Sequence, residues 1–201
     1  MGVTMSKLDK RIQELLANSF YGINEQDEYG ETVLHLAARS SNYERVKLLI
    51  EKGADVNVKN KEQRTPLHDA ALAENAETIQ ALLEEGADVN ATDCSGYTPL
   101  HWASTMCCKD AVIKLIEGGA NVNAQNHIGR TPLHEAVFMR EIGNIRAILE
   151  AGGDLNVRDH KGYTPINLAH KAGVKEIVEE LTAYKDSTES FPELMSKQYK
   201  F

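Results

Sequence analysis

Apolar and polar positions alternate along the chain with the period of an amphipathic helix. Apolar side chains at 46–49 and again at 79–83 lie three or four residues apart, and each run ends at a glycine, Gly53 or Gly86. This spacing predicts a helix with one buried face, and glycine is the usual residue just after a helix end. Similar runs recur further along the chain and predict several helices of this kind.

A second, shorter helix is predicted ahead of each of these runs. Its start is marked by Thr-Pro-Leu-His at Thr65, Thr98 and Thr131, by Thr-Val-Leu-His at Thr32 and by Thr-Pro-Ile-Asn at Thr164. Threonine is a good N-cap, and proline fits the first helical position, where its missing N–H costs nothing. Small alanines later in the motif allow a neighbouring helix to approach closely.

Both signals repeat with one period. The threonines stand 33 residues apart, and the glycines that begin Gly-Ala-Asp-Val-Asn or a close variant keep the same interval at Gly53, Gly86, Gly119 and Gly152. Two landmarks that stay in phase establish an internal repeat of two helices and a connecting turn. Tight turns such as Asp93-Cys-Ser-Gly96 then project as fingers.

This combination resembles the ankyrin repeat family, whose 33-residue period and Thr-Pro-Leu-His-x-Ala signature it matches over about residues 7–184. The resemblance implies an all-α solenoid of stacked helix-turn-helix units with β-hairpin finger loops and a concave groove.

The repeat register divides the chain into seven segments. We expect an N-terminal capping half-repeat at 1–26, repeats at 27–59, 60–92, 93–125 and 126–158, a C-terminal capping repeat at 159–184, and a polar, loosely held tail at 185–201. Lys185 stands where a further glycine would fall, so the array is expected to stop there.

Glycine is missing at some positions where the repeat normally has it. Gln63 replaces the finger glycine of the second repeat, so that turn either differs or holds a strained residue at positive φ. The fifth repeat keeps a glycine, Gly173, between its two helices. At the equivalent position the first four repeats have Ser41, Glu74, Cys107 and Arg140. Those turns are expected to be tighter or less stable.

Composition and charge narrow the function. The 201 residues are 42% hydrophobic and 26% charged, with a formal charge of −8, which fits one globular domain and argues against wrapping a phosphate backbone. Three cysteines and no signal-like start favour a reducing compartment, the cytoplasm or also the nucleus. No apolar stretch reaches the roughly 18 residues needed to cross a bilayer. We expect a monomer.

The resemblance implies that a partner protein binds the concave face formed by fingers and first helices. On that face we expect one apolar patch across repeats three and four, and charged residues around it, made of Trp102, Met106, Phe138, Met139, Tyr97, Ile128, Arg130, Arg64, Asp69 and Glu135. Asp69 and Glu135, together with Glu31 on the same face, suggest a partner segment with basic residues around an apolar anchor. The alternative is that Trp102 and Phe138 only pack between adjacent helices.

No chemistry is predicted for the recurring histidines at 35, 68, 101 and 134. They stand 33 residues apart, so they cannot converge on one ion, and the resemblance implies a structural bond to the signature threonine. Cys107-Cys108 lacks the spacing of a zinc site. No catalytic, metal or cofactor site is expected, and we predict that the chain is not an enzyme.

The leading hypothesis is therefore a cytosolic adaptor, scaffold or inhibitor that binds another protein. Two alternatives stay open. The start Met-Gly-Val-Thr-Met-Ser fits N-myristoylation at Gly2, which would make a membrane-tethered scaffold. Alternatively, the C-terminal segments Phe191-Pro-Glu-Leu-Met and Tyr199-Lys-Phe201 act as a linear motif that recruits a larger assembly.

Overall fold

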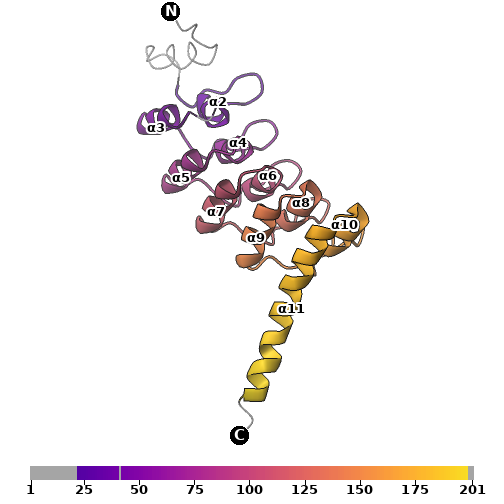
Figure 1. Cartoon of the computed structure of the whole chain (residues 1–201). Helices are drawn as coiled ribbons and strands as arrows, with labels where there is room; N and C mark the ends of the chain where they lie inside the picture. The colour runs from indigo at the N-terminus through magenta and orange to yellow at the C-terminus, as the bar shows by residue number, and fades with distance from the viewer. Residues whose placement is uncertain (1–21, 41, 199–201) are drawn as a thin grey trace, which may run out of the picture.

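The computed structural model describes residues 22–40 and 42–198, and it describes residues 188–198 by their backbone alone. Over these residues the regular elements are all helices, joined by turns, and none of the fingers contains a strand. The helices stack in pairs along one direction (Figure 1). The predicted all-α solenoid is confirmed.

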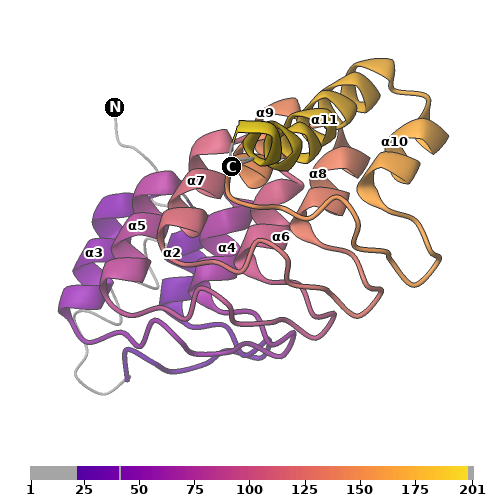
Figure 2. The ribbon, with the colours of Figure 1, turned by 90° about the horizontal axis from the view of Figure 1, so that it is seen from below.

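The helices form two layers. The first helices of the pairs are α2 (Val33–Arg39), α4 (Pro66–Leu72), α6 (Pro99–Ser104), α8 (Pro132–Met139) and α10 (Pro165–Ala172). The second helices are α3 (Tyr43–Glu51), α5 (Ala76–Glu84), α7 (Lys109–Glu117), α9 (Ile142–Glu150) and α11 (Lys175–Gln198). Each first helix packs on the next first helix, and α3, α5, α7 and α9 pack likewise. Figure 2 shows the finger loops beside the first-helix layer.

Each first helix begins with a reciprocal cap between its threonine and its third helical residue, which is the signature histidine in the first four repeats and Asn167 in the last. Thr98 is extended, with φ −88° and ψ 166°, and its hydroxyl accepts a hydrogen bond from the amide of His101. In return, Nδ1 of His101 accepts the amide of Thr98 at 3.1 Å. The same box is present at the other four helix starts, so Val33 in place of proline does not disturb the first of them.

The core between the layers is a set of repeated columns. The signature leucines Leu34, Leu67, Leu100 and Leu133 are fully buried, and so are the alanines Ala37, Ala70, Ala103 and Ala136. Replacing a buried leucine by alanine typically costs about 2–5 kcal/mol, because both transfer energy and packing are lost. The stack therefore depends on these two columns.

A ladder of asparagines links the ends of the second helices and accounts for the second landmark of the sequence. Oδ1 of Asn57 accepts the amide of Asp88 at 2.8 Å, and its Nδ2 donates to the carbonyl of Gly86 at 3.0 Å. Equivalent pairs of bonds start from Asn24, Asn90 and Asn123. The ladder joins consecutive repeats at a place where backbone groups would otherwise lack partners.

The second finger keeps the turn of its neighbours although it lacks their glycine. Gln63 has φ +61°, and its amide donates to the Asn60 carbonyl at 2.9 Å, as the amide of Gly30 does to the carbonyl of Asp27. Of the two possibilities in the sequence, the strained residue at positive φ is therefore the one adopted. Such a conformation costs a non-glycine residue roughly 1–2 kcal/mol.

The turns between paired helices use the same left-handed conformation in three repeats. Glu74, Arg140 and Gly173 have φ of 58°, 67° and 68°. Cys107 is not among the positive-φ residues, and α6 ends earlier, at Ser104. Ser41 lies outside the described residues.

The segment after residue 184, expected to be a polar, loosely held tail, is helical over most of its length, and how firmly it is held stays a prediction. α11 continues through Lys185 to Gln198, which makes it about 36 Å long at 1.5 Å per residue. Figure 1 shows it projecting beyond the stack. The physical reason is that the other second helices end next to a glycine, whereas Lys185 stands at the equivalent position here and does not terminate the helix.

Most of the predicted N-terminal capping half-repeat, including Gly2, lies outside the described residues. The described part begins at Gly22, and Asn24 occupies the first rung of the asparagine ladder. The division into seven segments stays a prediction. Among the described helices, none combines the length and the apolar character needed to span a bilayer.

Candidate functional site

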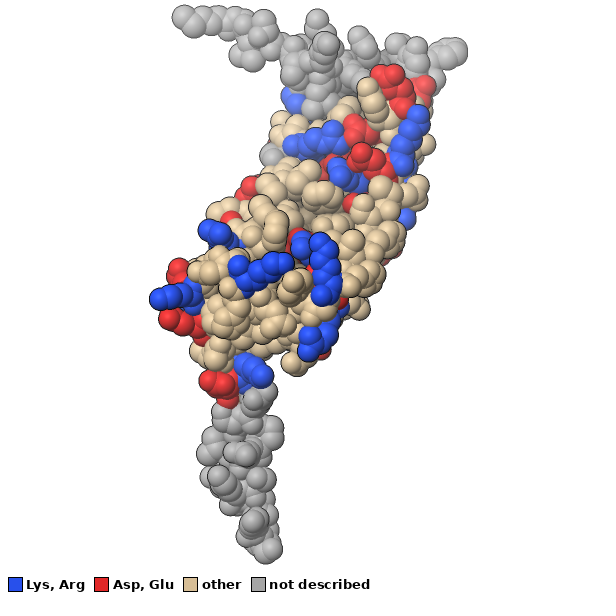
Figure 3. Space-filling model, turned by 90° about the vertical axis from the view of Figure 1, so that its right-hand side faces the viewer, with Lys and Arg blue, Asp and Glu red and all other residues tan. Residues whose placement is uncertain are grey.

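We define the finger face as the surface made by the fingers and the first helices. Figure 3 looks onto this side of the molecule and shows side chains of both charges near the N-terminal repeats and Lys and Arg gathered toward the C-terminal ones. Three positions of each repeat contribute to it. They are the residue before the signature threonine, the residue after the histidine, and the residue three positions further on.

Trp102 is held in a cluster on this face by residues from two repeats. Its indole N–H donates to Oδ2 of Asp93 at 3.1 Å, and the guanidinium of Arg64 lies 4.5 Å from the ring centroid. The ring of Tyr97 is 5.3 Å away. Trp102 is half-buried and packs against the core, so it both joins repeats and contributes to the surface.

Glu135 is buried and positions two of its neighbours. One oxygen accepts the hydroxyl of Tyr97 at 2.9 Å, and the other lies 3.5 Å from Arg130. Burial and then the nearby carboxylate raise the pKa of Tyr97 to about 12, which keeps the phenol protonated as the donor of this bond. The carboxylate is therefore used within the protein and offers a partner little surface.

Asp69 is likewise buried and engaged. Arg39 donates to its two oxygens at 3.1 and 3.2 Å, and also pairs with Glu31. Burial raises the pKa of Asp69 to about 6, against the opposing effect of the arginine. Of the three acidic residues that suggest a basic partner segment, Asp69 and Glu135 are thus buried and ion-paired, and Glu31 is paired with Arg39.

The exposed apolar side chains of the predicted set belong to repeat four. Ile128, Phe138 and Met139 are 50%, 60% and 45% exposed, which is unusual for large apolar residues. The guanidinium of Arg130 lies 5.1 Å from the Phe138 ring centroid. Met106 is half-buried in the turn between α6 and α7. The structure therefore places the predicted residues in a half-buried group around Trp102 and an exposed group in repeat four, and Tyr97, Glu135 and Arg130 link the two.

A small concavity that sequence reasoning missed lies next to this exposed group. We call it the C-terminal hollow. It holds about 250 Å³ and is lined by Arg130, Phe138, Asp159, Lys161, Tyr163, Leu168, Lys171 and Ala172.

A spacing of eight residues could have pointed to this concavity. Residues eight apart meet on the finger face, as Glu31 and Arg39 do in repeat one and Arg130 and Phe138 do in repeat four. Tyr163 and Lys171 form the same kind of pair in the last repeat.

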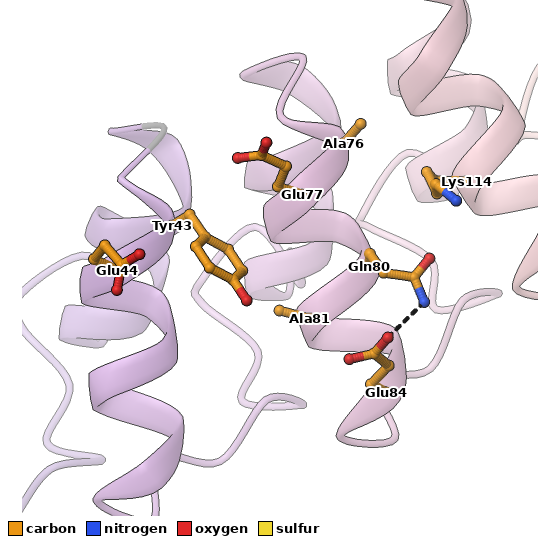
Figure 4. A pocket seen from close by; sticks show the side chains of 8 residues that line it. All are labelled: Tyr43, Glu44, Ala76, Glu77, Gln80, Ala81, Glu84 and Lys114. Carbon is orange, nitrogen blue, oxygen red and sulfur yellow. Dashed lines mark hydrogen bonds between the residues drawn. The ribbon is translucent and has the colours of Figure 1, made fainter.

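A larger hollow of about 570 Å³ lies on the opposite side, across the second helices. Figure 4 shows Tyr43 of α3 pointing toward Ala81 of α5, with acidic side chains around them. One signal for it in the sequence is that Ala76 and Ala81 place small side chains among longer ones. This hollow shares no residue with the finger face.

Both ring nitrogens of each of the four signature histidines form hydrogen bonds within the protein. Nδ1 of His68 accepts the Thr65 amide at 3.0 Å, and Nε2 donates to the Tyr97 carbonyl of the next repeat at 3.1 Å. An amide can only donate and a carbonyl can only accept, so the proton is on Nε2. Burial lowers the pKa of His68 to about 4, which keeps the ring neutral at physiological pH.

Two comparisons with known proteins bear on identity. A family model described as ankyrin repeats in three copies matches residues 3–93, 58–126, 92–159 and 109–190. Ankyrin repeat domain-containing protein 31 from Mus musculus is 51% identical over 39 residues, which are 19% of this chain and 2% of that protein. The match thus spans a very small part of that relative.

Proposed function

Because the chain belongs to the ankyrin repeat family, whose repeats generally serve as protein–protein interaction modules, we propose that it binds a partner protein on the finger face of repeats three to five. In this proposal it acts as an adaptor, scaffold or inhibitor and has no catalytic role. Its exposed free thiols, Cys94 and Cys107, favour a reducing compartment, the cytoplasm or the nucleus.

The observation that carries the proposal is the exposure of Ile128, Phe138 and Met139 beside a rigidly held tryptophan. Large apolar side chains on a monomer surface are costly unless something covers them, and aromatic, methionine and arginine side chains are enriched at the centres of interfaces. Trp102 supplies a second aromatic side chain that does not have to be ordered on binding, because Asp93 and Arg64 already fix it.

The two alternative functions lack a comparable observation. Gly2, the candidate lipid site, lies outside the described residues, and the C-terminal motif is described through the backbone of α11 only, up to Gln198. The finger face is therefore the better supported site.

Affinity capture from a native lysate tests the proposal. We expect Phe138→Ser/Met139→Ser to lose the proteins that the unmodified chain retains, because the exposed apolar group is removed. The matched control is Leu48→Ser, which changes an apolar side chain that is 37% exposed on the second-helix side. Retention of the same proteins by the double variant, or equal loss with the control, would refute binding at this face.

A further inference from the structure

The exposed charged side chains around the C-terminal hollow are positive, whereas the whole chain has a net negative charge. The protein carries a formal charge of −8, yet the charged side chains exposed around this hollow are Lys161 and Lys171, with Arg130 behind them. Arg158 is exposed on the adjoining finger, where its guanidinium donates to the Gly162 carbonyl at 2.8 Å. A local positive surface therefore stands out on an acidic protein.

The carboxylates near the hollow do not cancel this charge at the surface. Asp159 is buried, and its Oδ1 accepts the amides of Lys161 and Tyr163, each at 2.9 Å. Burial opposes its ionisation, but the two amide bonds and the nearby His134 and Arg130 together lower the pKa of Asp159. Its Oδ2 lies 3.8 Å from Nε of Arg130, and Glu135 pairs with the same arginine. Both carboxylates face Arg130, so Lys161 and Lys171 carry the outward charge.

The side chain of Lys171 is held in place by Tyr163. Its ammonium lies 4.4 Å from the ring centroid of Tyr163 and donates to the Tyr163 hydroxyl at 3.1 Å. An ammonium has three donor hydrogens, so further donors remain for an incoming acceptor. Because the side chain is already placed, less conformational entropy is lost when it binds a charged group.

The remaining walls of the hollow are apolar. Phe138 forms one side, and Leu168 with Ala172 of α10 forms another. The volume of about 250 Å³ is smaller than the roughly 300 Å³ at which sites for small-molecule ligands begin. An apolar cavity of this size with a cationic rim suits a single side chain of a protein.

We propose that the C-terminal hollow receives one aromatic or large aliphatic side chain of the partner protein, and that aspartates or glutamates flank that side chain and pair with Lys161 and Lys171. This inference rests on the proposed function of the finger face. It reverses the basic segment that the sequence suggested, because Asp69 and Glu135 are buried and ion-paired. Matching charges across an interface give specificity and faster association.

A titration followed by amide NMR tests the assignment with the full chain. The probe is the peptide acetyl-Asp-Glu-Phe-Glu-Asp-amide, and the charge-inverted probe is acetyl-Lys-Arg-Phe-Arg-Lys-amide. We expect saturable shifts of the Phe138, Tyr163 and Leu168 amides with the acidic peptide. Lys161→Glu/Lys171→Glu should weaken that binding about tenfold or more, since attraction is replaced by repulsion.

The control variant Lys47→Glu/Lys52→Glu changes the net charge by the same amount on the second-helix side, and it should leave the affinity unchanged. Three results would each overturn the inference: no saturable shifts, tighter binding of the inverted peptide at the hollow, or equal loss of affinity in the control. If capture of the native partner still depends on Phe138 and Met139, the proposed function survives that failure; if it does not, both fail.

Discussion

The indole N–H of Trp102 donates a hydrogen bond to Oδ2 of Asp93 at 3.1 Å, which ties the first helix of repeat three to its own finger. Arg64 of the preceding repeat lies 4.5 Å from the same ring, so Trp102 also joins two repeats. Phe138 occupies the finger face one repeat later and is 60% exposed. Two aromatic residues of one predicted patch therefore have different roles.

Substitution by alanine should separate these roles. We expect Trp102→Ala to lower the free energy of unfolding by about 2 kcal/mol or more, because packing and a charge-assisted hydrogen bond are lost together. Phe138→Ala should change it by less than about 0.5 kcal/mol. Urea denaturation of both variants measures this, and equal losses would show that Phe138 is also a packing residue.

The strained finger gives a pair of reciprocal predictions. Gln63→Gly should stabilise the protein by up to about 1 kcal/mol, since glycine adopts φ +61° without strain. Gly162→Gln should destabilise it by a similar amount, because Gly162 has φ +80°; an added Cβ meets no atom within 4 Å there, so backbone strain alone is tested. Thermal unfolding of the two variants is the measurement. A loss of stability in Gln63→Gly would show that the glutamine side chain is needed there.

The buried histidines predict a loss of stability in mild acid. Burial lowers the pKa of His101 to about 4, whereas an unfolded histidine titrates near 6.5. Between these values the unfolded state binds more protons, so the stabilising contribution present above pH 6.5 is lost as pH falls toward 4. Asp69, with its pKa raised to about 6, acts in the opposite direction because its contribution is lost as pH rises.

The variant His101→Asn isolates the histidine effect, because Asp69 is common to both proteins. Asparagine already serves at this position in the last repeat, where Oδ1 of Asn167 accepts the Thr164 amide at 3.2 Å. We expect urea midpoints of the variant to fall less steeply than those of the unmodified chain between pH 6.5 and 4. Parallel curves would contradict a titrating His101.

The last helix is anchored to the stack by a defined hydrogen bond. The hydroxyl of Tyr184 donates to the Leu149 carbonyl at 2.6 Å. Tyr184→Phe should cost about 1 kcal/mol, because that carbonyl loses its side-chain donor. Tyr29→Phe, at an exposed finger position, is the control and should have no effect on the urea midpoint. A neutral Tyr184→Phe would mean that apolar packing alone holds α11.

The repeated elements could be predicted because their signals are local. The threonine cap, the histidine at the third helical position and the buried leucine each act within one turn of helix, and a fixed period then repeats them. Gln63 is recognisable as a departure for the same reason.

The contacts on the finger face were harder to predict because they join residues at different positions of the repeat. Asp69 and Glu135 stand at a position that holds Leu36 and Leu168 in other repeats, a pattern that could have indicated partial burial. Their arginine partners, Arg39 and Arg130, come from two other positions, which a single column does not reveal. The extension of α11 was missed because Lys185 ends the repeat but does not end the helix.

The central claim is that the finger face of repeats three to five contacts the partner, and site-specific photo-crosslinking tests it most directly. A photoreactive amino acid is introduced at Met139 or, as the comparison, at Leu48 on the second-helix side, and each protein is irradiated in its native lysate. We predict a discrete crosslinked partner from position 139 and none from position 48. Crosslinks from position 48 alone would contradict the claim.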